Sequence, residues 1–156
     1  MNIINSDKDS ISTITNELNK PNISIVLIHH IQCGHCINLR PTWEKFKELN
    51  KNKPFKIIDI EANELSKMEH PIKKHIIGFP TIMKVKNGQV DENFMKERTL
   101  DNINAFANSA VKKKLNNLNN MMKSKKKNIK RKIISKKRKI QKVKKNKTKK
   151  SKKSKK

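Results

Sequence analysis

Cysteine is scarce in this chain, because only Cys33 and Cys36 occur among its 156 residues. A structural zinc site built from two C-x-x-C pairs needs four thiols, so that class of site is excluded. What remains is one pair of thiols separated by Gly34 and His35. The chemistry that this pair supports is the first question that the sequence raises.

Long apolar runs are missing as well. The run from residue 23 to residue 31 is too short to span a bilayer and predicts a buried strand. Residues 1–10 are polar and lack the apolar segment of a secretory signal, and the chain ends in lysines instead of an endoplasmic-reticulum retention tetrapeptide. We therefore expect no transmembrane segment and a cytoplasmic or nuclear protein, or a virion component if the source is a virus.

Acidic residues are absent from the last part of the chain. Residues 112–156 hold 24 of the 39 Lys and Arg and none of the 13 Asp and Glu, so the net charge of +26 lies almost entirely there. We predict a folded domain at 1–111 and a Lys-rich basic tail at 112–156. Because the tail combines few apolar residues with unopposed charge, we expect it to be disordered, or helical only on a polyanion.

The tail also lacks aromatic side chains, since none occurs after Phe106. Base stacking is therefore excluded, and sequence-specific readout is disfavoured. Lysines gain affinity by releasing counterions from phosphates, so we predict non-specific binding of residues 112–156 to nucleic acid or another polyanion. A solvated charge run, a nuclear import signal at 125–139 and contact with an anionic membrane stay open as alternatives.

Before the tail, apolar periodicity and turn residues predict an α/β domain with the element order αβαβαββα. The pair Asn87-Gly88 supplies the two positive φ angles of a type I′ turn, so it predicts a hairpin. Leu39, Trp43, Phe46 and Leu49 recur at helical spacing and predict the face of one helix that packs on the sheet. Trp43 is accordingly interpreted as a core residue and not as a substrate contact. The predicted elements are helix 9–19, strand 23–31, the helix after Cys33, strand 54–60, helix 63–75 broken at Pro71, strands 81–85 and 90–94, and helix 100–111.

The thiol pair lies between a predicted strand and a predicted helix. A strand that delivers two thiols to the first turn of a helix places both sulfurs within bonding reach, near unsatisfied backbone N–H groups. Cys33 should be the exposed nucleophile of low pKa, and Cys36 the buried resolving thiol. His35 can stabilise the thiolate when it is protonated. The pattern predicts exchange with protein thiols and disulfides through a redox-active Cys33–Cys36 disulfide, with no bound cofactor.

Four motifs resemble the thioredoxin fold in its protein disulfide isomerase version, over about residues 7–114. They are Cys33-Gly34-His35-Cys36, Pro41, Gly78-Phe79-Pro80-Thr81 and Arg98-Thr99. The resemblance implies a central mixed β-sheet flanked by helices, and a monomeric thiol–disulfide oxidoreductase or isomerase.

The resemblance also implies roles for individual residues. Pro80 matches the cis-proline that packs against the dithiol, and Phe79 and Thr81 flank it where substrate binds. Gly34 belongs to the active-site motif. Arg98 matches an arginine that approaches the resolving thiol and helps to deprotonate it.

One departure from the family concerns a buried charged pair. Relatives place an acid six residues before the first cysteine, where this chain has Leu27, and its lysine partner on the next strand is replaced by Ile57. Losing both is physically coherent, because a lone buried charge costs several kcal/mol. Deprotonation of Cys36 is then expected to be slow or to depend on Arg98.

Two alternatives to an enzyme stay open. His29 and His30 could join the two cysteines in a zinc or copper site, but adjacent residues of a strand point to opposite faces, so we predict no metal. The other alternative is a nucleic-acid packaging or tethering protein whose thioredoxin-like domain only binds partners.

Overall fold

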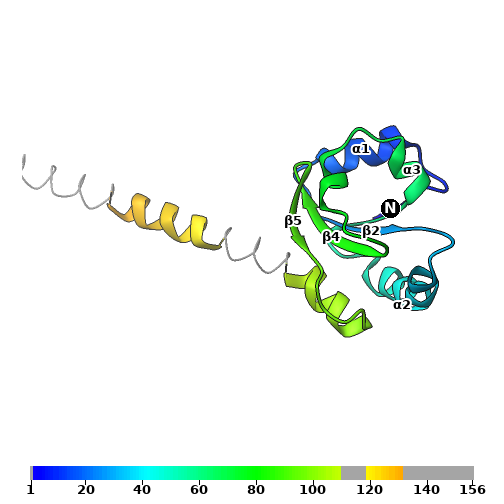
Figure 1. Ribbon diagram of the computed structural model, residues 1–156. Helices are drawn as coiled ribbons and strands as arrows, with labels where there is room; N and C mark the ends of the chain where they lie inside the picture. The colour runs from blue at the N-terminus through cyan, green and yellow to red at the C-terminus, as the bar shows by residue number, and fades with distance from the viewer. Residues whose placement is uncertain (1, 110–118, 132–156) are drawn as a thin grey trace, which may run out of the picture. The chain divides into compact units, whose positions relative to one another are not determined.

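The computed structural model describes residues 2–109 and 119–131. The chain divides into two units, Met1–Lys112 and Lys113–Lys156. The first unit is built on a five-stranded mixed sheet with the strand order β1-β3-β2-β4-β5 (Figure 1). The fold is the α/β thioredoxin fold that the sequence predicted.

The strands lie close to their predicted positions. They are β1 (Ile3–Asn5), β2 (Ser24–His29), β3 (Lys56–Glu61), β4 (Thr81–Lys86) and β5 (Gln89–Asn93). β3 is parallel to both β1 and β2, whereas β4 is antiparallel to both β2 and β5. The short edge strand β1 was not predicted, because three residues are too few to show a period of two.

The helices cover both faces of the sheet (Figure 1). Helices α1 (Ile11–Asn19) and α3 (Ala62–Ser66) lie on one face, and α2 (Gly34–Asn50) and the helix of residues 100–109 lie on the other. Ser10 caps α1, since its Oγ accepts a hydrogen bond from Thr13 N at 3.2 Å. The predicted break at Pro71 is confirmed, because α3 ends at Ser66 and a 3-10 helix, η1 (Pro71–His75), begins at the proline.

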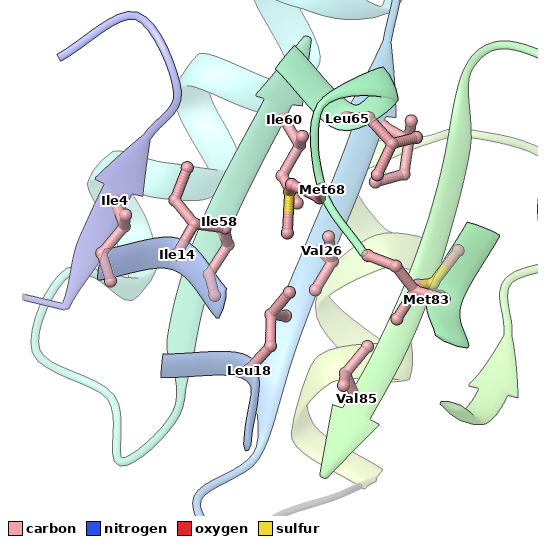
Figure 2. Close-up of a cluster of buried hydrophobic side chains, with 12 residues drawn as sticks. Ile4, Ile14, Leu18, Val26, Ile58, Ile60, Leu65, Met68, Met83 and Val85 are labelled. Carbon is pink, nitrogen blue, oxygen red and sulfur yellow. The ribbon is translucent and has the colours of Figure 1, made fainter. Parts of the chain in front are cut away.

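Each face of the sheet carries its own hydrophobic core. Side chains alternate along β2, so Val26 and Ile28 join the α1 side while Ile25 and Leu27 join the α2 side. Figure 2 shows the α1 side, where apolar side chains from the sheet meet those of α1, α3 and the following loop. The dithiol helix α2 therefore packs on a core separate from the one that holds α1.

The predicted apolar face of α2 is correct for Leu39, Trp43 and Phe46, which are buried, but wrong for Leu49, which is 62% exposed. A helix has 3.6 residues per turn, so the buried face passes to position 50. Asn50 is buried there, and its Nδ2 donates to Phe46 O at 2.8 Å and to Asn104 Oδ1 at 2.7 Å. A polar bridge thus joins α2 to the helix of residues 100–109.

The hairpin between β4 and β5 is confirmed, with φ angles of 51° at Asn87 and 73° at Gly88. Its turn is tied to the end of α1, because Asn87 N donates to Lys20 O at 3.0 Å and Gly88 N donates to Leu18 O at 2.9 Å. A Cβ at position 88 would lie 2.5 Å from Asn19 Oδ1. Glycine is therefore required here both by the backbone angle and by the neighbouring side chain.

Within the second unit, residues 119–131 are helical and exposed. They include Lys123, three lysines at 125–127, Lys130 and Arg131, and no acidic residue. The predicted state of residues 112–118 and 132–156 lies outside the described residues. In the two described stretches of the chain, no helix has the length and apolar character that crossing a membrane requires.

Candidate active site

The two thiols lie at the N-terminus of α2. Cys33 is the N-cap residue, and Cys36 N donates to its Sγ at 3.4 Å. A turn closed by Cys33 N donating to His30 O at 3.1 Å connects the end of β2 to this position. Cys33 is partly exposed and Cys36 is buried, both as free thiols. The strand–turn–helix arrangement predicted for the motif is confirmed.

The two thiols have opposite electrostatic environments. The hydrogen bond with the Cys36 side chain lowers the pKa of Cys33. The pKa is lowered further by the backbone N–H groups of Cys36 and His35 and by the charge of Arg98, whereas burial raises it. Burial raises the pKa of Cys36 to about 11, and the hydrogen bond with Cys33 adds to that effect. The more exposed sulfur is therefore the more acidic one.

The loop before β4 lies against Cys33. The Phe79–Pro80 peptide bond is cis, as the resemblance implies, and the Cys33 thiol donates to Phe79 O at 3.5 Å. Thr81 Oγ1 donates to Gly78 O at 2.6 Å. Arg98 Nη2 donates to Pro80 O at 3.1 Å, which links the arginine to the same loop. The structure thus brings all the residues predicted for the site to one end of the sheet.

A hollow of about 280 Å³, called here the proline groove, adjoins this loop. The exposed apolar side chains of Ile77, Phe79 and Met95 line it together with Pro80 and Arg98. Exposed apolar surface next to a reactive group is typical of a site that binds another molecule.

A buried charged cluster behind the dithiol was missed by the sequence analysis. Asp59 on β3 accepts hydrogen bonds from Trp43 Nε1 and, at 2.9 Å, from Lys47 Nζ. Asp59 is the register partner of Leu27 on β2, so the acid absent at Leu27 is present one strand away. Its cation comes from α2. The acid and lysine are absent at Leu27 and Ile57, as the sequence analysis stated, but a different buried pair that it did not predict, Lys47–Asp59, lies beside them. A lone acid between isoleucines was the available signal, because such a charge needs a buried partner.

Burial shifts the pKa values in this cluster. It raises the pKa of Asp59, although the charge and hydrogen bond of Lys47 and the hydrogen bond of Trp43 oppose the shift. Burial alone would lower the pKa of Lys47, but the hydrogen bond that Lys47 donates to Glu44 and the interaction with Asp59 raise it above its usual value. Trp43 is a core residue as predicted, and its indole N–H also donates a hydrogen bond to the Asp59 carboxylate.

A second cavity, of about 130 Å³ and called here the rear cavity, is lined both by residues of this cluster and by the resolving thiol Cys36. Leu27, His29, Cys36, Asp59 and Pro80 are among the residues that line it. The cavity brings a histidine and a carboxyl group to the buried side of the resolving thiol.

The two adjacent histidines have different neighbours, although His30 lies just beyond β2, which ends at His29. His29 lines the rear cavity, whereas the ring of His30 lies 6.0 Å from the ring of Phe79 at the proline groove. In residues 2–109 and 119–131, no group of three or more His, Cys, Asp or Glu side chains is placed to hold a metal ion.

Comparisons with known proteins agree with this geometry. The thioredoxin family model matches residues 8–109. The chain is 32% identical over 79 residues to a protein disulfide-isomerase of Ricinus communis, covering 49% of this chain and 16% of that protein. It is 31% identical over 96 residues to protein disulfide-isomerase 2-3 of Arabidopsis thaliana, covering 61% of this chain and 21% of that protein. The chain thus spans about a fifth or less of the length of these curated relatives.

Solved structures show the same fold. The J-Trx1 fragment of ERdj5 superposes with a TM-score of 0.59 at 19% identity, covering 71% of this chain and 52% of that one. The thioredoxin of Malassezia sympodialis, Mala s 13, superposes with a TM-score of 0.54 at 14% identity, covering 70% of this chain and 93% of that one. From the family match over most of the first unit and the dithiol at the start of α2, we conclude that this chain belongs to the thioredoxin family.

Proposed function

We propose that this protein is a thiol–disulfide oxidoreductase of the protein disulfide isomerase type, acting on disulfides of other proteins. The observation that carries the proposal is the asymmetry of the dithiol. A partly exposed Cys33 of lowered pKa lies beside a buried Cys36 whose pKa is raised to about 11. The similarity to protein disulfide-isomerases supports the same chemistry.

The proposed reaction has two exchange steps. The Cys33 thiolate attacks one sulfur of a substrate disulfide, and the other substrate sulfur leaves as a thiolate. Cys36 then loses its proton and attacks Cys33 Sγ, which forms the Cys33–Cys36 disulfide and releases the second substrate thiolate. The substrate gains two electrons and the protein loses two. The reverse sequence oxidises a substrate dithiol, and the two directions together isomerise disulfides.

Substrate would bind in the proline groove. An extended segment lying along the Pro80 loop would place its disulfide near Cys33, and Phe79 and Thr81 would flank it. The guanidinium of Arg98, held by Pro80 O, favours the thiolate form of both cysteines. The backbone N–H of His35 adds to this effect at Cys33.

Two measurements test the enzyme proposal. Iodoacetamide below pH 7 should alkylate Cys33 before Cys36, because only the thiolate reacts. In insulin reduction, Cys33→Ser should be inactive and Cys36→Ser should accumulate mixed disulfides. Alkylation in the opposite order, or wild-type activity in both variants, would contradict the proposal.

We propose further that residues 112–156 bind polyanions such as nucleic acid without sequence preference. The described part of this tail supports the idea, because residues 119–131 form a helix with six basic and no acidic side chains. Each phosphate that the tail neutralises releases counterions, so affinity should fall steeply with salt.

The tail proposal is tested by removing all residues after Val111. The shortened protein should reduce a small disulfide as the full chain does, but should lose most of its affinity for duplex DNA in fluorescence anisotropy. For the full chain, log affinity against log salt should have a slope of about −0.9 per phosphate neutralised, equal for two unrelated sequences. Equal binding by the shortened protein, or no salt dependence, would refute polyanion binding by the tail.

A further inference from the structure

The proposed exchange reaction, on which this inference depends, requires a base for the resolving thiol. With a pKa of about 11 in the free dithiol, Cys36 is almost entirely protonated at neutral pH. Burial is the largest cause of that value, and it is a cause separate from the hydrogen bond and charge of Cys33. A group that takes the proton as Cys36 attacks would remove this restriction.

The side chains on the buried side of Cys36 identify candidates for that base. Leu27 cannot accept a proton, whereas His29, two residues further along the same face of β2, also lines the rear cavity with Cys36. Asp59 lines the cavity too, but its two oxygens accept the hydrogen bonds of Trp43 and Lys47. His29 is therefore the better-placed acceptor.

We propose that His29 is the general base for Cys36. As Cys36 Sγ attacks Cys33 Sγ in the mixed disulfide, its proton passes through water in the rear cavity to a ring nitrogen of His29, and the substrate sulfur leaves with the bonding electrons. In the oxidising direction the imidazolium returns the proton to Cys36. The cavity volume of about 130 Å³ exceeds the space that one water needs, which is about 10–15 Å³.

The charges around His29 suit this role. Burial lowers the pKa of His29, so its imidazole is neutral and able to accept a proton at neutral pH. The carboxylates of Asp59, Asp7 and Glu61 oppose that shift and would stabilise the imidazolium once it forms, while Arg40 disfavours it. The titratable groups lining the rear cavity are Asp7, His29, Cys36, Arg40, Glu44 and Asp59.

The step can be measured in isolation on the full chain. Glutathione is attached to Cys33 as a mixed disulfide, and its release by Cys36 is followed by stopped flow between about pH 6 and pH 9. In the wild type, the release rate should be nearly constant above the pKa of His29, because a neutral base assists each attack. In His29→Ala, the rate should rise tenfold per pH unit with the thiolate fraction, about 100-fold over two units.

Three further measurements distinguish a general base at position 29 from a residue with only a structural role. Free imidazole in the buffer should accelerate release in His29→Ala but not in the wild type. His29→Gln keeps a polar side chain in the cavity and should show the same steep pH dependence, so the test survives if the alanine variant folds poorly. Arg40→Gln removes a charge but no base, and should move the acid limb of the wild-type profile to higher pH.

The inference fails if His29→Ala and His29→Gln keep the wild-type rates and pH dependence, or if the wild type itself shows the steep dependence. It also fails if imidazole has no effect on the alanine variant. A wild type that never releases glutathione would instead refute the proposed oxidoreductase function, so the two failures are distinguishable.

Discussion

Replacing Lys47 by Met tests the buried charged cluster most directly. The Lys47 side chain lies on the α2 face that packs on the sheet, where the residue is 9% exposed, and its Nζ is 2.9 Å from Asp59 Oδ2. Asp59 is 4% exposed, so neither group is well solvated. Methionine fills similar volume without the charge and leaves the Asp59 carboxylate with the Trp43 indole N–H as its remaining charge-stabilising contact in the cluster.

The expected loss follows from this burial. Removing one partner of a buried ion pair costs about 3–5 kcal/mol. In a domain of this size each kcal/mol lowers Tm by about 4–8 °C, so Tm should fall by at least about 12 °C. Lys51→Met is the matched control, because the Lys51–Glu48 pair joins side chains that are 53% and 72% exposed and should contribute at most about 1 kcal/mol.

The loss should also depend on pH. Burial raises the pKa of Asp59, and Lys47 holds it back, so the Lys47→Met variant should raise it further. An acid whose pKa is higher in the folded state stabilises the fold at low pH, and that contribution disappears as pH rises through the folded-state pKa. The deficit of Lys47→Met relative to wild type should therefore be largest at pH 7 and shrink as the pH falls.

Urea unfolding followed by Trp43 fluorescence, at pH 7 and at about pH 4, measures both effects, since Trp43 is the single tryptophan. The reasoning is refuted if Lys47→Met loses no more stability than Lys51→Met at pH 7. A deficit equal at the two pH values would refute the assignment to an unpaired Asp59 carboxylate.

Other expected outcomes concern the dithiol, the hairpin and the polar bridge. His35→Pro removes a backbone N–H that lowers the pKa of Cys33, so the Cys33–Cys36 disulfide should become harder to reduce. Each tenfold change in its equilibrium constant with glutathione corresponds to about 30 mV, and an unchanged reduction potential would contradict this expectation. Gly88→Ala should lower the free energy of unfolding in urea by at least about 1–2 kcal/mol, because of the positive φ at position 88 and the contact with Asn19. Wild-type stability in this variant would show that neither feature requires glycine. Asn50→Ala should cost about 1–3 kcal/mol by the same assay, and a smaller loss would show that the bridge is dispensable.

Local chemistry explains what the sequence could predict. Asn87-Gly88 specified the hairpin because few residues tolerate positive φ, and the spacing of Cys33 and Cys36 specified a thiol pair at a helix start. The strand at residues 24–29 and the break at Pro71 follow from equally local rules.

Tertiary contacts determine the features that the sequence alone could not predict. Lys47 and Asp59 are twelve residues apart on different elements, and only the packing of α2 on β3 brings them together. The exposure of Leu49 and the burial of Asn50 depend on which way α2 rotates over the sheet. The sequence suggested His29 only as a metal ligand. Its place beside Cys36 could not be predicted, because the cavity that the two residues share is formed by several separate elements.

The register between β2 and β3 has a consequence for comparing this chain with its relatives. Leu27 and Asp59 are opposite each other in a parallel ladder, so their side chains share one face and their strands lie about 4.8 Å apart. Aligned with a relative that has the acid implied by the resemblance, this chain shows leucine at position 27, although a carboxylate lies only one strand spacing away. Function at such a site is better traced by position in space than by position in the alignment, and a designer could exchange the two side chains, with Asp at 27 and Leu at 59, to return the carboxylate to the central strand.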